Sequence, residues 1–214
     1  MNRTDTWLSQ LQQQRAIAVI RAKDVETGVQ MARAVAAGGM RLIEVTWNST
    51  EPAKLLHQLQ NELPTCTIGA GTLLTLTDLQ AAITAGAEFV FSPHTSLPFI
   101  QTAQQHHLPV IPGALTPTEI LTAWQAGATC VKVFPIQSVG GADYLRHLQG
   151  PLGAIPMIPT GGVTLENARA LINAGAIAVG LAGQLFPKAA VQQQNWQAVT
   201  QAAQTLMQRL HSAE

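Results

Sequence analysis

Lys132 stands where a strand pattern would place an apolar residue. In the run 130–135 (CVKVFP), Val131 and Val133 share one face of a β-strand and Lys132 lies on the other. Valine is typical of the face that packs against helices, so we expect Lys132 to point into the interior of a barrel. An ammonium there loses hydration, which favours a free amine near neutral pH. Such an amine attacks ketones and forms a protonated imine, which lets a neighbouring C–C bond break. The alternative is a lysine that reaches to the barrel mouth or pairs with a carboxylate for structural reasons.

A second strand pattern brings a carboxylate to the same interior. In the run 42–47 (LIEVTW), Ile43 and Val45 form the helix-facing side, which leaves Glu44 facing inward. Imine chemistry needs a proton carrier, because water must leave the carbinolamine and the hydroxyl that becomes an aldehyde must lose its proton. We expect Glu44 to do both, directly or through one water. The alternative is an ion pair with Lys132 that only fills the barrel, and burying two ions rarely stabilises a fold.

Three more strand ends carry small residues that suit anion binding. The backbone N–H groups exposed by Gly71, with the Thr72 hydroxyl, are predicted to hold a substrate carboxylate. The runs 159–164 (PTGGVT) and 180–183 (GLAG) follow the last two strands, where barrels commonly bind phosphate on unpaired N–H groups and a helix N-terminus. Tight turns between strands and helices are the alternative for each run. His94, after the fourth strand, is placed to touch substrate, although a solvated loop histidine is the simpler interpretation.

The elements that must position these residues follow a regular alternation. Short β-branched runs recur along the chain: IAVIRA at 17, LIEVTW at 42, CTIGAGT at 66, FVFSP at 89, PVIPGA at 109, CVKVFP at 130, PMIPTGG at 156 and AIAVGLA at 176. Stretches rich in Ala, Leu and Gln, each long enough for one helix, separate them. This order implies right-handed crossovers and a parallel sheet. We therefore predict an α/β fold, a single-domain (β/α)8 TIM barrel over residues 1–214, with an extra N-terminal helix over residues 5–15. A doubly wound open sheet is the alternative.

The charge balance argues against two classes of partner. Twelve basic and twelve acidic residues give no net charge, and only 11% of positions are charged, so no field attracts nucleic acid or an anionic membrane. No apolar run approaches the ~20 residues that span a bilayer, and the first residues lack a signal-peptide core, so we expect a cytoplasmic protein. Cys66 and Cys130 are expected to be buried free thiols. The histidines form no same-face pair near carboxylates, so neither a metal nor a cofactor is expected.

Six short motifs together resemble one known family. They are IEVT at 43–46, GAGT at 69–72, FSP at 91–93, IPG at 111–113, VKVFP at 131–135 and PTGGV at 159–163. In this order they are similar to the bacterial 2-keto-3-deoxy-6-phosphogluconate (KDPG) / 4-hydroxy-2-oxoglutarate aldolase family, from about residue 15 to about residue 190. The resemblance implies a homotrimeric, metal-free class I aldolase. Such an enzyme releases pyruvate and glyceraldehyde 3-phosphate from KDPG, or pyruvate and glyoxylate from the shorter substrate.

The resemblance also implies roles for individual residues. Lys132 looks like the Schiff-base lysine and Glu44 like the general acid/base. The remaining implied contacts are Gly71 and Thr72 at the pyruvate carboxylate, Pro93 and Phe134 as pocket walls, Thr160 beside the phosphate loop, and Gly161, Gly162, Ala182 and Gly183 at the phosphate.

Two departures from the family pattern bear on substrate choice. The chain has Asn48 where KDPG aldolases usually carry an arginine, and an asparagine offers only neutral hydrogen bonds to a substrate carboxylate. A similar Asn-Ser pair occurs in the related 2-keto-3-deoxy-6-phosphogalactonate (KDPGal) aldolases, so the galactonate epimer is an alternative substrate. Gly183 replaces a serine often found in the family, which removes one side-chain donor from the phosphate loop.

Other functions remain compatible with these residues. The enamine that Lys132 would form also permits decarboxylation of oxaloacetate as a second activity. A phosphosugar isomerase or epimerase would use the same loops without a lysine imine. A phosphosugar-binding protein would keep the loops and lack turnover.

Overall fold

The computed structural model describes residues 3–212. Its strands are β1 (Ala16–Ile20), β2 (Leu42–Thr46), β3 (Thr67–Gly71), β4 (Val90–Phe91), β5 (Val110–Ile111), β6 (Gly113–Ala114), β7 (Val131–Val133), β8 (Met157–Pro159) and β9 (Val179–Leu181). Its helices are α1 (Arg3–Gln14), α2 (Val25–Ala37), α3 (Pro52–Glu62), α4 (Leu76–Thr84), α5 (Leu97–Gln105), α6 (Pro117–Gln125), a 3-10 helix η1 (Ile136–Val139), α7 (Ala142–Leu152), α8 (Ala168–Asn173), α9 (Lys188–Gln192) and α10 (Trp196–His211). Within residues 3–212, no helix has both the length and the apolar character needed to cross a membrane.

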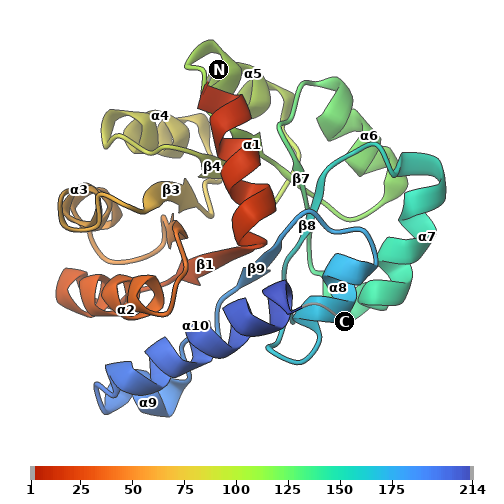
Figure 1. Cartoon of the computed structure of the whole chain (residues 1–214). Coiled ribbons are helices and arrows are strands. Elements are labelled where there is room, and N and C mark those ends of the chain that lie inside the picture. Colours follow the sequence, from red (N-terminus) through yellow and green to blue (C-terminus); the bar gives the residue numbers. More distant parts are fainter. Residues whose placement is uncertain (1–2, 213–214) are drawn as a thin grey trace.

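All paired strands run parallel, and the helices lie around the outside of the curled sheets, except α1, which crosses one end of the strands (Figure 1). A six-stranded sheet has the order β5-β4-β3-β2-β1-β9, and a three-stranded sheet has the order β6-β7-β8. The α/β class with a parallel, curled sheet is confirmed. The strands form two sheets rather than one continuous ladder, because Pro112 separates β5 from β6 and has no N–H for a neighbouring strand. A single bridge, Thr160 to Gly180, joins the ends of β8 and β9.

Local sequence explains where two of the helices begin. Thr75 caps α4 and Thr116 caps α6, and each threonine hydroxyl accepts a hydrogen bond from a backbone N–H in the first turn. The side chains of Asp78 and Glu119 accept hydrogen bonds from the threonine N–H groups in return. These helices start directly after the loops that leave β3 and β6, so the caps fix where those strands release the chain.

Two apolar clusters hold the molecule together, one between strands and helices and one inside the curled strands. The inner cluster contains Trp7, Leu11, Ile17, Leu42, Phe89, Phe91, Ile111, Cys130, Ile158 and Ala178. Trp7 and Leu11 belong to α1, which therefore closes the interior at the amino ends of the strands. Cys66 and Cys130 are buried free thiols, as predicted. The filled lower interior leaves the carboxyl ends of the strands as the place for a site.

Candidate active site

A cavity of about 410 Å³ lies at the carboxyl ends of the strands. It is lined by Val19, Arg21, Glu44, Thr46, Thr72, Pro93, Lys132, Phe134, Thr160, Gly161, Gly162, Val163, Thr164, Gly180, Ala182, Gly183 and Gln184. These residues come from β1, β2, β7 and β9 and from the segments that follow β1, β3, β4, β7, β8 and β9. The cavity thus brings together most of the residues that the sequence singled out.

Lys132 lies in the middle of β7 and faces the cavity. Its exposed fraction is only 6%, so the side chain does not extend to bulk solvent. Two aromatic rings flank the amine, with Nζ 5.0 Å from the ring centroid of Phe134 and 5.8 Å from that of Phe91. An amine held between apolar rings at the floor of an open cavity can reach a ketone that enters from the mouth.

Glu44 lies on β2 and faces the same cavity with an exposed fraction of 2%. Burial raises the pKa of this carboxyl above its ordinary value, and the positive charges of Lys132 and Arg21 oppose that rise. Its Oε1 is buried and has no hydrogen-bond partner among the described residues. Across residues 3–212, the ion pairs within 4.0 Å do not include one between Glu44 and Lys132. A direct ion pair that only fills the barrel is therefore not what the structure shows.

Gly71 lies next to the Glu44 carboxylate, a relationship that the sequence did not predict. It does not line the cavity, and a Cβ built on it would lie 1.8 Å from Oε1 of Glu44 and 2.2 Å from Cδ. The absent side chain therefore makes room for the Glu44 carboxylate. Thr72, the next residue, does line the cavity and has a φ of 57°, a left-handed conformation that is uncommon for a β-branched residue. Such strain often accompanies a functional position.

The two glycine-rich loops border the cavity side by side. Gly161 and Gly162 have φ angles of 88° and 79°, and a Cβ on Gly162 would lie 2.3 Å from Cβ of Gln137, so only glycine fits this turn. A Cβ on Gly183 would meet no atom within 4 Å. Thr160, which precedes the first loop, forms the bridge to Gly180 that draws the loops together. Backbone N–H groups of such loops are suited to an anion.

Of the remaining residues singled out in the sequence, three line the cavity and His94 does not. Pro93 and Phe134 line the cavity, and the Phe134 side chain is 36% exposed at its mouth. Ala182 also lines it. His94 does not line the cavity, in keeping with the simpler interpretation of a loop histidine.

Asn48 does not line the cavity either, and it points to a residue that the sequence reasoning missed. Its Oδ1 accepts a hydrogen bond of 3.1 Å from Nε of Arg21, which directly follows β1 and does line the cavity. An arginine thus stands beside the site, supplied by a different strand. A charged residue straight after the apolar run IAVI was the signal that could have found it. Other lining residues that were missed are Val19, Thr46 and Gln184, whereas Val163, Thr164 and Gly180 lie within the two predicted phosphate-binding runs.

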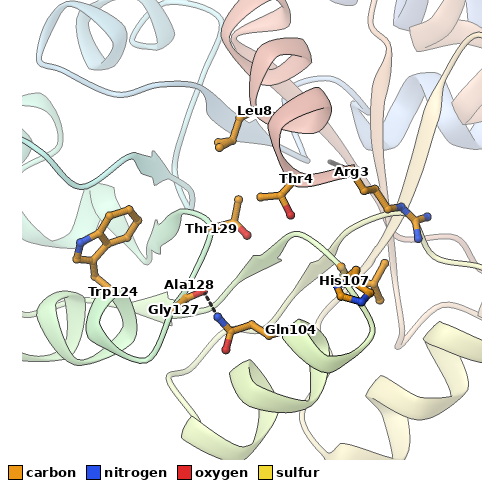
Figure 2. Close-up of a pocket in the computed structure, with 10 residues that line it drawn as sticks. Arg3, Thr4, Leu8, Gln104, His107, Trp124, Gly127, Ala128 and Thr129 are labelled. Atoms are coloured by element: carbon orange, nitrogen blue, oxygen red, sulfur yellow. Dashed lines mark hydrogen bonds between the residues drawn. The ribbon is translucent and has the colours of Figure 1, made fainter. Parts of the chain in front are cut away.

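A larger cavity, about 560 Å³, lies beside α1 at the amino ends of the strands (Figure 2). It is lined by Arg3, Thr4, Leu8, Gln104, His107, Leu108, Trp124, Gly127, Ala128 and Thr129. These lining residues include neither a lysine nor a carboxylate, so this cavity cannot support imine chemistry. The smaller cavity is the one that combines an amine, a carboxyl, apolar walls and anion-binding loops.

Comparison with known proteins shows that this chain is similar to aldolases. The family model for KDPG and KHG aldolases matches residues 8–202. A 2-dehydro-3-deoxy-phosphogluconate aldolase of Treponema pallidum is 37% identical over 157 residues, which cover 73% of this chain and 75% of the relative. A KDPG aldolase of Legionella pneumophila, solved with pyruvate captured as a covalent carbinolamine, has a TM-score of 0.86 and 28% identity over 93% of this chain and 97% of its own. A native KDPGal structure has a TM-score of 0.83 and 28% identity over 91% of this chain and 93% of its own.

Proposed function

This chain belongs to the KDPG and KHG aldolase family, and we infer that it is an aldehyde-lyase acting through a Schiff base on Lys132. Its reaction is the reversible cleavage of KDPG to pyruvate and glyceraldehyde 3-phosphate, or of 4-hydroxy-2-oxoglutarate to pyruvate and glyoxylate. The observation that carries this function is the pair formed by Lys132 and Glu44, a buried amine and a buried carboxyl of raised pKa that face one cavity without a direct ion pair.

The chemistry assigned to the pair proceeds in balanced steps. The uncharged Lys132 amine adds to the C2 carbonyl, and Glu44 supplies a proton as the carbinolamine loses water, leaving a protonated imine. The Glu44 carboxylate then takes the proton of the C4 hydroxyl, the C3–C4 bond breaks, and its electrons form an enamine. Protonation of the enamine carbon and hydrolysis of the imine release pyruvate and restore the amine. The unpaired Oε1 of Glu44 is the atom positioned to carry these protons.

The rest of the substrate is assigned to the loops. We place the pyruvate carboxylate at Thr72 and the phosphate at Gly161, Gly162 and the Ala182-Gly183 segment, with Thr160 between the two ends. Pro93 and Phe134 form the apolar walls.

KDPGal is the second candidate substrate, and one observation favours it. Asn48 holds Arg21 by the Nε bond, which leaves both Nη groups of the guanidinium fork for an anionic part of the substrate. Position 48 itself carries an asparagine followed by a serine, as in the Asn-Ser pair of the KDPGal aldolases. The related KDPGal structure gives this candidate a precedent within the same fold.

The other functions differ in what they require of Lys132. Oxaloacetate decarboxylation would use the same enamine as a second activity. A phosphosugar isomerase or epimerase, or a phosphosugar-binding protein, would leave the buried amine without a task. The buried lysine beside an unpaired carboxyl therefore favours the aldolase.

We also propose a closed barrel and a trimer. Counting β5 and β6 as one strand broken at Pro112 gives a single-domain (β/α)8 barrel, supported by the pairing of β1 with β9 and the Thr160 bridge. The most exposed large apolar side chains, Leu74, Leu76, Leu97, Leu121, Trp124 and Phe134, all fall within residues 74–134. Because neighbouring β/α units lie side by side, this sector supplies an apolar surface for a homotrimer in the cytoplasm.

The function is tested by assaying KDPG, KDPGal and 4-hydroxy-2-oxoglutarate side by side for pyruvate release. We expect release from at least one phosphorylated epimer, complete loss in Lys132→Ala, and retention in the control Lys188→Ala, an exposed lysine outside the cavity. Full activity of Lys132→Ala would favour an isomerase. Stabilisation by phosphosugar acids without pyruvate release from any of the three would identify a binding protein.

A further inference from the structure

Phe91 lies beneath the lysine that forms the proposed Schiff base. Its ring is 1% exposed, and Nζ of Lys132 lies over it at 5.8 Å from the centroid. Phe134 covers Nζ at 5.0 Å from another strand end. The amine therefore lies near two ring faces, that of Phe134, which lines the cavity, and that of Phe91, which is buried.

The ring of Phe91 is held in this orientation by a column of aromatic side chains. Phe89 meets Phe91 edge to face, with centroids 5.8 Å apart and planes at 77°. Trp7 of α1 supports Phe89 from below at 5.4 Å. Gly69 of β3 leaves space for the column, because a Cβ there would lie 2.4 Å from Cδ2 of Phe89. The N-terminal helix is thus connected to the lysine through packed rings.

We propose that Phe91 is a positioning residue for Lys132 that stabilises the cationic Schiff base through the face of its ring. The inference rests on the proposed function. When the uncharged Lys132 amine, a ketone and a proton from Glu44 give a protonated imine and one water, Nζ gains a positive charge, and the keto acid displaces water from the cavity. A ring face attracts a cation more strongly once water has left, so the contribution of Phe91 grows as the imine forms.

Two ionisable groups of the same cavity bear on the charge of the imine nitrogen. Glu44 is the buried carboxyl that faces the same cavity, and burial raises its pKa, which disfavours its negatively charged form. Arg21 adds a positive charge to the site. The aromatic ring faces favour positive charge on Nζ whatever the protonation state of Glu44.

The test weakens the negative charge on the ring face in steps while keeping the shape of the ring. Phe91 is replaced site-specifically by 4-fluoro- and pentafluorophenylalanine, which weaken the negative ring face with little change in volume, and separately by leucine as Phe91→Leu. Phe99 receives the same replacements as the matched control, because it is equally buried and belongs to the cluster between strands and helices rather than to the aromatic column. The readout is the amount of pyruvate adduct on Lys132 trapped with borohydride across a range of pyruvate concentrations.

We expect the adduct equilibrium constant to fall stepwise with fluorination at position 91, by roughly five- to thirtyfold for the pentafluoro ring. The same replacements at position 99 should change it by less than about twofold. An unchanged constant at position 91, or equal losses at both positions, would overturn the proposal. If Phe91→Leu fails to fold, the fluorinated series still decides. Absence of any adduct in the unmodified protein would instead contradict the proposed function.

Discussion

The Glu44 carboxylate occupies the space that a side chain on Gly71 would need, with only 1.8 Å between Oε1 and a Cβ built at position 71. The two residues lie on adjacent strands without being register partners, because Gly71 is opposite Thr46 and Glu44 is opposite Gly69. Glycine at position 71 is thus explained by the position of the acid, since its φ is not in the left-handed region. This relationship leads to the first prediction.

Gly71→Ala should displace the Glu44 carboxylate and lower kcat by roughly a hundredfold or more, the contribution expected of a positioned acid/base. Pyruvate release at saturating substrate, measured across pH, gives the effect. Gly150→Ala is the control, because a Cβ there meets no atom within 4 Å. Wild-type turnover with an unchanged pH profile in Gly71→Ala would contradict the role given to Glu44.

Glu44→Gln should change stability in a pH-dependent way. Burial raises the pKa of Glu44 in the folded protein, so the folded state holds a proton that the unfolded state releases above the ordinary glutamate pKa of about 4.3. The contribution of this group to stability therefore falls as pH rises from that value through the folded pKa. Urea unfolding at several pH values should show the variant gaining stability relative to wild type as pH rises. A difference that shrinks with rising pH would show that the Lys132 charge outweighs burial.

Gly183→Ser should improve binding of phosphorylated substrates. The Cβ has open space and the backbone is not left-handed, so the serine fits without strain and adds one donor to the proposed phosphate loop. One hydrogen bond is worth roughly 0.5–1.5 kcal/mol, so KM should fall about two- to tenfold. Gly183→Ala should not change KM, and 4-hydroxy-2-oxoglutarate, which has no phosphate, should not benefit. An equal gain for all substrates would argue against a phosphate at this loop.

Arg21 and Asn48 should act as one unit. Arg21→Gln removes a charged donor from the cavity and should raise KM roughly tenfold or more, since hydrogen bonds to charged groups are worth about 1.5–3 kcal/mol. Asn48→Ala removes only the bond that holds Nε and should have a smaller effect. The double variant should resemble Arg21→Gln alone, because Asn48 acts through the arginine. Strict additivity of the two effects would show that Asn48 contacts substrate itself.

The strand pattern predicted the fold class and the residues that face inward, for a simple physical reason. Side chains alternate along a strand, so Lys132 and Glu44 could be assigned to the interior from their valine and isoleucine neighbours. The division into two sheets depends on two interruptions of the pairing, one at Pro112 between β5 and β6 and one between β8 and β9, and the second has no signal in the sequence.

Several contacts within the site were not predicted from the sequence, because they depend on distances between strands that no local pattern encodes. Gly71 makes room for a carboxylate on the adjacent strand, and its backbone contact with substrate stays a prediction. Asn48 accepts a hydrogen bond from Arg21, 27 residues away in sequence, and its own contact with substrate stays a prediction. Phe91 was known only as part of a motif until the inner cluster placed its ring under the amine.

The most direct measurement of the central claim is borohydride reduction in the presence of pyruvate, followed by peptide mass mapping. The predicted result is one stable adduct on the peptide that contains Lys132, with none on the peptides that contain Lys23, Lys54 or Lys188. Pyruvate release without any adduct, or an adduct confined to another lysine, would contradict a Schiff base at Lys132.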